Sequence, residues 1–200
     1  MAKVKTDSQN VYQGMALIAD PIHQYALFTV PEESSPAEST EKELIDSPWM
    51  QRLRRIYQLQ SARWVYPAAE HTRFQHSVGT MHVAGEFAKS IYPSLRDVCK
   101  DVPSLNYIEE LLRLAGLLHD VGHGPYGHFF DDNFLSRWHL THEMVGQNII
   151  IQKLGEKIAD IRRSPSGAFA RGEKMDARKI SYLIKMPEGV QGSREPRWLV

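Results

Sequence analysis

The sequence predicts an all-α fold that begins with one short hairpin or extended segment. Two long segments, Phe74–Tyr92 and Ile108–Val121, repeat apolar residues at helical spacing. Strand signals are weak in the rest of the chain, and there is no internal repeat. We therefore expect helices to form the core and strands to be confined to the N-terminal part.

The composition fits one domain with short appendages. Of the 200 residues, 42% are apolar, and 24 basic side chains balance 24 acidic ones. Balanced charge predicts no membrane partner and no clear nucleic-acid surface, although it allows a local basic pocket. The lone Cys99 excludes an internal disulfide framework and a cysteine zinc cluster. No apolar run approaches the ~20 residues of a membrane span, and no signal peptide is visible, so we expect a soluble, cytoplasmic protein.

The N-terminal part should contain three irregular or extended segments. Residues 1–14 are expected to form a flexible lead-in. The segment Asp20–Val30 mixes Tyr, Phe, Val and Thr after a turn, which is typical of a hairpin or an extended stretch. Residues 31–40 are rich in Ser, Glu and Pro and should form an exposed loop.

Two short helices should follow this loop. Thr40 and Glu43 match a capping box, which predicts a helix that ends near Asp46. Ser47 can cap a second helix with Pro48 as its first residue. Apolar and arginine side chains then alternate so that they lie on separate faces of this second helix.

Helical spacing and capping residues predict the remaining elements. We expect helices at Phe74–Tyr92 and Ile108–Val121, a short one within 127–135, one over 143–154 capped by Thr141, and one over 176–185. Loops are expected over 162–172 and 187–196. The stretch Leu111–Leu118 is apolar on every face except at Arg113, which predicts a central buried helix. Residues 196–200 resemble the opening of a further helix, so we expect that C-terminal residues are missing after Val200.

Histidines concentrate where the apolar helix ends. Five of the nine histidines lie between Leu117 and His142, and adjacent His119 and Asp120 are followed by a glycine-rich turn. Imidazole and carboxylate together suit a transition-metal ion. Because neighbours on a helix point about 100° apart, His119 and Asp120 need a further ligand from another segment. His76 is the best candidate, since it lies in the first turn of a predicted helix.

Four ordered motifs carry a resemblance to a known family. They are Asp46–Leu59 (DSPWMQRLRRIYQL), Tyr66-Pro67, His71–Gly79 (HTRFQHSVG) and His119–His128 (HDVGHGPYGH), and Asp20–His23 (DPIH) accompanies them. Together they resemble the HD-domain superfamily of metal-dependent phosphohydrolases, and within it the deoxynucleoside triphosphate triphosphohydrolase branch. The match spans about residues 20–155. It implies a helical HD domain over residues 15–186, with its core motifs in 44–155 and an appendage over 187–200.

The resemblance implies an activity and a set of site residues. The expected reaction is hydrolysis of dNTPs to a deoxynucleoside and triphosphate. The implied metal ligands are His76, His119 and Asp120, and His128 and His142 match two further active-site histidines. Arg73 matches a substrate-phosphate arginine, and Gln58 and Leu59 match residues near the sugar and base. The ligand set leaves Mn, Fe, Zn, Co or Ni open as the one divalent ion, with Mg as an alternative. Family members often form homo-oligomers.

Weaker transfers and structural interpretations apply to other residues. Asp46, Gln51 and Arg54 match a nucleotide-effector region of some family members, although a solvated helix face explains the arginines equally. His123 is either a structural residue or a neighbour that supports the ligands. The remaining histidines are expected to be structural or surface residues: His23, His71, His82 and His139.

The chain departs from the family pattern at the last metal ligand. The family's acidic motif has its closest local counterpart in residues 176–182, where Arg178 stands at the ligand position and Ser181 at a later acidic one. Either the site has degenerated, or the motif lies beyond Val200, or Asp176 acts as a shifted ligand. The alternatives to a dNTP hydrolase are therefore an HD phosphohydrolase of another nucleotide or phosphoester, and a catalytically inert nucleotide-binding regulatory module.

Overall fold

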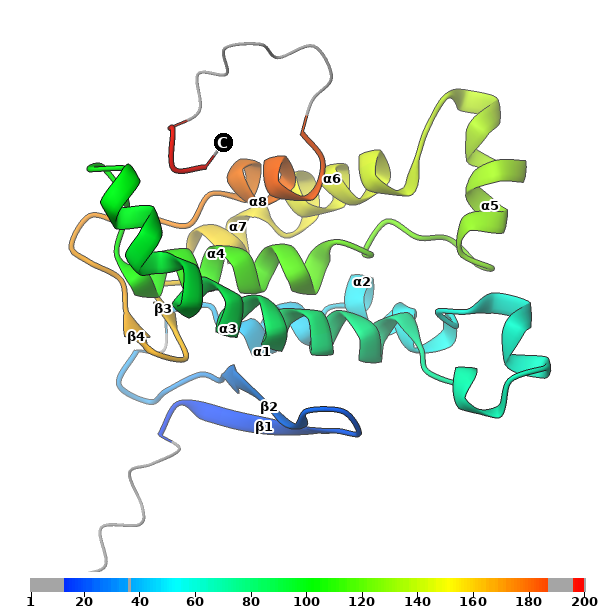
Figure 1. The fold of residues 1–200 in the computed structure, drawn as a ribbon, viewed down its shortest axis with the longest axis horizontal. Helices are drawn as coiled ribbons and strands as arrows, with labels where there is room; N and C mark the ends of the chain where they lie inside the picture. The colour runs from blue at the N-terminus through cyan, green and yellow to red at the C-terminus, as the bar shows by residue number, and fades with distance from the viewer. Residues whose placement is uncertain (1–12, 36, 187–195, 200) are drawn as a thin grey trace, which may run out of the picture.

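Two helices packed side by side form the centre of the molecule. The computed structural model describes residues 13–35, 37–186 and 196–199. Helix α3 (Arg73–Val98) and helix α4 (Leu105–Leu118) run antiparallel along each other through the middle of the fold (Figure 1). Four leucines of α4 are almost completely buried: Leu111, Leu114, Leu117 and Leu118. The prediction of a central buried helix is therefore confirmed.

The N-terminal hairpin is also confirmed. Strand β1 (Met15–Asp20) pairs with strand β2 (Gln24–Thr29) in an antiparallel register that runs from Met15 opposite Thr29 to Asp20 opposite Gln24. The Asp20 carboxylate accepts hydrogen bonds from the backbone N–H groups of Ile22 and His23, at 2.9 and 2.8 Å, and so closes the turn. β1 starts before the segment that the sequence indicated.

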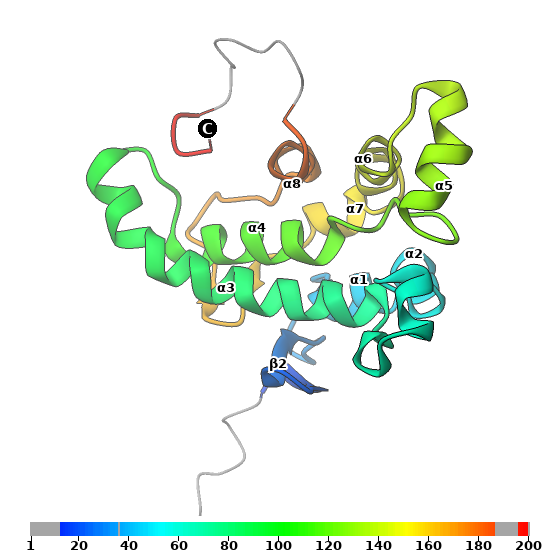
Figure 2. The same cartoon turned by 45° about the vertical axis from the view of Figure 1, so that its right-hand side comes forward.

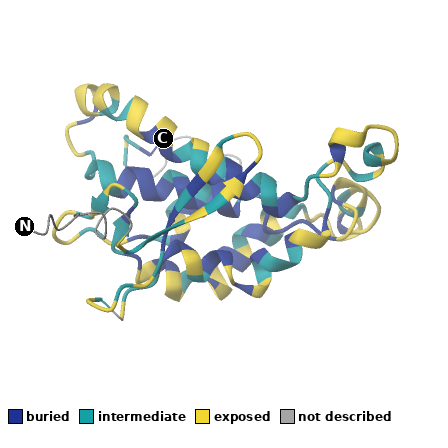
Figure 3. Ribbon diagram, turned by 90° about the horizontal axis from the view of Figure 1, so that it is seen from below, coloured by how far each residue is buried: buried dark blue, intermediate teal, exposed yellow. Residues whose placement is uncertain are grey.

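The other elements pack on two sides of the central pair. They are α1 (Glu41–Ile45), α2 (Pro48–Gln51), α5 (His128–Asn133), α6 (His142–Lys153), α7 (Gly155–Ala159) and α8 (Ala177–Ile184), with 3₁₀ turns at Arg52–Arg55, Gln60–Trp64, Pro67–Ala69 and Leu135–Trp138. The hairpin lies on one side of α3 and α4, and α6 and α8 lie on the other (Figures 1 and 2). Buried residues line the surfaces where these layers meet (Figure 3). Within the described residues, no helix combines the length and apolarity needed to cross a bilayer.

Helix starts follow the capping residues closely. Ser47 and Thr141 each accept a hydrogen bond from a backbone N–H in the first turn, of α2 and α6 respectively. Helix α1 starts after Thr40 as expected, but the Thr40 side chain makes no capping bond. The Glu41 N–H donates to the Thr29 hydroxyl, at 2.9 Å, which ties α1 to the hairpin.

Four expectations were wrong or lie outside the described residues. The predicted loop over 162–172 contains a two-residue hairpin of β3 (Arg163–Ser164) and β4 (Gly167–Ala168), and α7 was not foreseen. Residues 197–199 form a turn, where the sequence suggested the opening of a helix. Most of the lead-in over 1–14 and of the loop over 187–196 falls outside the described residues.

A charged group is buried beneath α4. The Arg113 guanidinium donates to the Glu41 carboxylate at 2.7 Å and to the Leu27 carbonyl at 2.7 Å, which joins α4 to α1 and the hairpin. Neighbouring Glu110 is fully buried, and neither of its carboxylate oxygens has a hydrogen-bond partner among the described residues. Burial, together with the negative charge of Glu41, raises the pKa of Glu110 well above its ordinary value.

Candidate metal centre and acid–base site

One group of potential metal ligands lies where the start of α3 meets the end of α4. The two Nε2 atoms of His76 and His119 are 3.2 Å apart. The Asp120 carboxylate lies 3.4 Å from His119 Nε2 and 4.0 Å from His76 Nε2. Two nitrogen ligands of one ion lie about 3.0–3.4 Å apart when each bond is about 2.1 Å long. The spacing of the two imidazoles therefore fits a shared divalent ion.

Local structure orients the two imidazoles. Thr72 caps α3 and places His76 in its first turn. His119 follows the last residue of α4, and its Nδ1 lies 2.7 Å from the Gly116 carbonyl. That carbonyl accepts the Nδ1 proton, so the Nε2 lone pair is free to bind an ion. Burial, and then the nearby His119, lower the pKa of His76, which favours the neutral imidazole that a metal needs.

The Asp120 carboxylate is held in its charged form. Arg73 Nη1 donates to it at 2.7 Å, and His123 Nε2 lies 3.3 Å away. Burial by itself would raise the pKa of Asp120, but the close approach of His123 Nε2 and the charges of His119 and Arg73 outweigh it and hold the pKa below its ordinary value. A charged carboxylate beside two imidazole nitrogens is a donor set that suits a divalent transition metal.

A second group of histidines surrounds Asp131 on the adjacent segment. His142 Nδ1 lies 2.6 Å from the Asp131 carboxylate, His128 Nδ1 lies 3.4 Å from it, and His123 Nδ1 lies 3.7 Å from it. The ligand atoms of these four residues lie within 4.8 Å of one another. Distance alone would therefore allow an ion in this group as well.

Ring orientation distinguishes the second group from the first. The rings of His123 and His142 are stacked, with centroids 3.7 Å apart and planes at 14°. Imidazole lone pairs lie in the ring plane, so two parallel rings cannot both point at one ion. His76 and His119 meet instead at 76°. His128 meets His142 at 72°, so ring orientation excludes only the stacked pair as joint ligands of one ion. The three Nδ1 atoms that face the Asp131 carboxylate are what favour proton transfer for the second group.

Glycines allow the backbone approach that brings the two groups together. A Cβ atom at Gly122 would lie 1.9 Å from the His142 carbonyl oxygen and 2.4 Å from the Gly146 nitrogen. At Gly127, which has a φ of +54°, a Cβ atom would lie 2.9 Å from Arg73 Nη2. Only glycine lets the turn after Asp120 lie directly against the start of α6.

The comparison with known families agrees with this geometry. The sequence profile of the HD domain family matches residues 73–180, more than half of the chain. The chain belongs to the HD domain family. The matched range contains both histidine groups. The expected fold class and the resemblance to HD domains are confirmed.

Several relatives share the HD region. Deoxynucleoside triphosphate triphosphohydrolase SAMHD1 of Bos taurus is 36% identical over 124 residues, and that of Homo sapiens is 37% identical over 124 residues. Both matches cover 60% of this chain, but only 18% and 17% of those relatives. An uncharacterized protein of Methanocaldococcus jannaschii is 33% identical over 178 residues, which is 86% of this chain and 33% of that protein. The chain thus spans a third or less of the length of these relatives.

The predicted site residues of this HD domain occupy different surroundings. The His128 side chain is 61% exposed and that of His142 is 14% exposed. Arg73 is only 1% exposed and forms an ion pair with Asp120, so it orients a candidate metal ligand. It is also the residue predicted to bind phosphate. Gln58 donates its backbone N–H to the His71 carbonyl, just before α3, and Leu59 beside it is 47% exposed.

The effector-region residues form local contacts. Arg54 donates to the Gln51 side chain at 2.8 Å, and its guanidinium lies 3.7 Å from the centre of the Phe74 ring. Asp46 pairs with Lys42 on the surface. Each of these contacts is sufficient to explain a structural role for its residue.

The structure argues against Asp176 as a shifted metal ligand. Lys179, in the first turn of α8, lies 3.4 Å from the Tyr107 hydroxyl, near the start of α4. Tyr107 and His119 are twelve residues apart, which is about 18 Å along a helix. The start of α8, where Asp176 lies, is therefore far from His119. Lys185, at the other end of α8, is the residue that lies near α6, 3.7 Å from Glu143. Among the described residues, the first group therefore contains three candidate ligands.

Asp131 is the site residue that sequence analysis missed. In the sequence, Asp131-Asp132 looks like the solvated face of a short helix. Its contact with His142 depends on how α5 and α6 pack. The available signal was weak, namely that Asp131 lies three residues after His128 and so faces the same side of a helix.

Proposed function

We propose that this HD domain is a metal-dependent phosphohydrolase that acts on dNTPs and releases a deoxynucleoside and triphosphate. The observation that carries the proposal is the convergence of His76, His119 and Asp120 beside a separate histidine group organised by one carboxylate. The dNTP substrate is supported by the two SAMHD1 relatives, whose names state that activity. Assembly into a homo-oligomer stays a prediction.

The first group would hold one divalent ion. When bound, such an ion lowers the pKa of water and polarises a phosphoryl oxygen. His76 and His119 supply two Nε2 atoms and Asp120 supplies a carboxylate oxygen. Arg73 keeps Asp120 charged and oriented through its 2.7 Å contact. Any Arg73 contact to substrate phosphate would use the part of the guanidinium that does not bind Asp120.

The second group would handle protons and phosphate. Hydrolysis forms a bond from a water oxygen to the α-phosphorus and breaks the bond from that phosphorus to the 5′ oxygen. The departing 5′ oxygen then needs a proton, which His128 can deliver because its side chain is exposed. Asp131 fixes the ring of His142, which would contact the phosphate. Gln58 and Leu59 would lie near the sugar and base.

Product analysis tests the proposal. The purified chain is incubated with each dNTP in the presence of Mn²⁺, and the products are separated by ion-exchange chromatography. The proposal predicts deoxynucleoside and triphosphate in equal amounts, and loss of both in a His119→Ala, Asp120→Ala variant. Release of single phosphates would instead indicate a phosphohydrolase of another specificity.

A second candidate function is a catalytically inert nucleotide-binding module. The observation that favours it is the set of three ligands, where the family resemblance implies four. Nucleotide binding without turnover of any dNTP, in protein that contains a full equivalent of metal, would support this candidate and contradict the enzymatic one.

A further inference from the structure

The turn that follows Asp120 joins the two histidine groups. Asp120 is a candidate metal ligand. His123, three residues later, places its Nε2 atom 3.3 Å from the Asp120 carboxylate and stacks its ring on His142. Gly122 and Gly124 lie in this turn, and glycine leaves the backbone more freedom than other residues do. The relative placement of the two groups therefore depends on what holds the turn.

Arg52, from a distant part of the sequence, holds this turn. Its guanidinium donates to the backbone carbonyls of Val121 and His123, the residues before and after Gly122. Val121 and His123 are both buried, and neither carbonyl accepts another hydrogen bond from the described residues. Hydrogen bonds from a charged donor are about twice as strong as neutral ones, and one planar guanidinium can bind two acceptors at once. Arg52 therefore fixes the orientation of two peptide groups in the turn.

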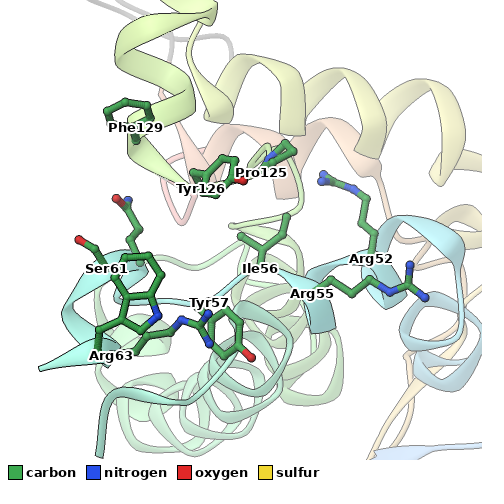
Figure 4. Close-up of a pocket in the computed structure, with 11 residues that line it drawn as sticks. Arg52, Arg55, Ile56, Tyr57, Ser61, Arg63, Pro125, Tyr126 and Phe129 are labelled. Atoms are coloured by element: carbon green, nitrogen blue, oxygen red, sulfur yellow. The ribbon is translucent and has the colours of Figure 1, made fainter. Parts of the chain in front are cut away.

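The structure around Arg52 directs its side chain to the turn. Arg52 begins the 3₁₀ turn directly after α2, and the next residue, Leu53, is fully buried and anchors the backbone. The side chain lines a cavity of about 820 Å³ and reaches toward Pro125, whereas that of Arg55 points away (Figure 4). The ion pairs that arginines form within the described residues do not include Arg52. Its donors therefore serve the backbone of the turn and not a carboxylate.

The geometry points to Arg52 as a positioning residue for both histidine groups. It acts through the backbone, because it sets the turn that places Asp120 beside His76 and His119 and places His123 against His142. The contact of Gly122 with the start of α6 positions the middle of the turn, and Arg52 sets the carbonyls before and after it. The effect of Arg52 on metal binding rests on the metal centre proposed above, whereas its hold on the turn does not.

Hydrogen exchange tests the hold on the turn without any metal. The full chain in EDTA is compared with Arg52→Gln and with the control Arg55→Gln, which makes the same change at an exposed arginine three residues later. We expect about tenfold faster exchange in peptides that cover residues 119–128 for Arg52→Gln alone, and no change in peptides from the second half of α3. No change in the turn, or an equal rise in α3, would overturn the proposal.

Metal affinity tests the consequence for the first group. Mn²⁺ binding is measured by calorimetry for the unmodified chain, Arg52→Gln, Arg52→Lys and Arg55→Gln. Loss of a residue that orients metal ligands weakens binding about 10–100-fold, and we expect this loss for Arg52→Gln. Arg52→Lys should show a smaller loss, because an ammonium cannot match the planar fork of a guanidinium. Equal Kd values for the four proteins would overturn the proposal. If the unmodified chain bound no Mn²⁺, the metal centre itself would be wrong, and hydrogen exchange would decide the role of Arg52.

Chemical rescue separates positioning from general support of the fold. In Arg52→Ala, guanidinium added below its denaturing range can enter the space that the side chain leaves, because Arg52 is only partly buried and lines the cavity. We expect guanidinium to restore most of the lost Mn²⁺ affinity and to slow exchange in residues 119–128 again. Tetramethylammonium is the matched control, since it carries the same charge but no N–H donor. No recovery with guanidinium, or equal recovery with both ions, would overturn the proposal.

Discussion

The two histidine groups are built from the same types of side chain, but their geometry differs. In the first, His76 and His119 come from two helices and meet edge to face, and their Nε2 atoms are 3.2 Å apart. In the second, His123 and His142 stack in parallel, and Asp131 binds the edge of His142. Histidine content alone would have assigned a metal to either group. The stacked pair in the second group, and the tautomers that the neighbouring carbonyl and carboxylate favour, are the reasons why we propose the ion for the first group and proton transfer for the second.

Removing a ligand of the first group should have the largest effect. His119→Ala takes away one of two imidazoles and leaves Asp120 and His76 without a common ion, so dNTP turnover should fall below detection. Steady-state assays with saturating Mn²⁺ measure this. If the His119→Ala protein kept its activity, the metal role proposed for the first group would be wrong.

Disturbing the carboxylate of the second group should have an intermediate effect. Asp131→Asn keeps the shape of the side chain but weakens its hold on His142, and turnover should fall about 10–100-fold, as for other carboxylates that orient histidines. Metal content should be unchanged. The matched control is Asp132→Asn, which alters the neighbouring acidic residue and should leave turnover as it is.

The contact between the two groups can be tested at Gly122. Gly122→Ala would place a methyl group against the His142 carbonyl, and we expect a loss of about 1–3 kcal/mol in the free energy of unfolding. Gly155→Ala is the control, because a Cβ atom there meets nothing closer than 3.7 Å. Urea denaturation of the three proteins gives the comparison, and equal midpoints would show that the close approach is unimportant.

The smallest expected effect is that of replacing Glu110 on the free energy of unfolding. Glu110 contrasts with Asp120. Both carboxylates are buried, but Asp120 is paired and Glu110 is not. A raised folded-state pKa means that stability is present at pH values below the unfolded pKa and is lost as the pH rises toward the folded pKa. Glu110→Gln should therefore stabilise the protein by about 1–2 kcal/mol at pH 7.5 and by less at pH 4.5. A larger gain at the lower pH would contradict the assignment.

Local features could be predicted from the sequence, whereas contacts between distant segments could not. The caps at Ser47 and Thr141 bond to residues three positions away, so the sequence is sufficient to place them. The all-round apolarity of Leu111–Leu118 indicated burial without any knowledge of its partners. The position of His76 in the first turn of a predicted helix made it the candidate partner of His119 and Asp120, and the resemblance to HD domains supported that pairing.

The features that were missed depend on packing. Asp131 becomes a site residue only because α5 places it against His142. Contact between Arg73 and phosphate stays a prediction, and the sequence did not indicate that its side chain is buried and paired with Asp120 where α3 and α4 meet. The 163–168 hairpin is held by the surfaces of α4 and the N-terminal strands, since Arg163 donates to the Val30 carbonyl at 2.7 Å. No local pattern of residues encodes such contacts.

Metal content tests the central distinction most directly. The unmodified chain, the His119→Ala, Asp120→Ala variant and the His142→Ala variant would be purified in parallel, loaded with Mn²⁺, desalted and measured by plasma mass spectrometry. We predict one equivalent of metal in the unmodified chain and in His142→Ala, and almost none in the double variant. Metal that is retained by the double variant but lost from His142→Ala would place the ion in the second group and contradict the account.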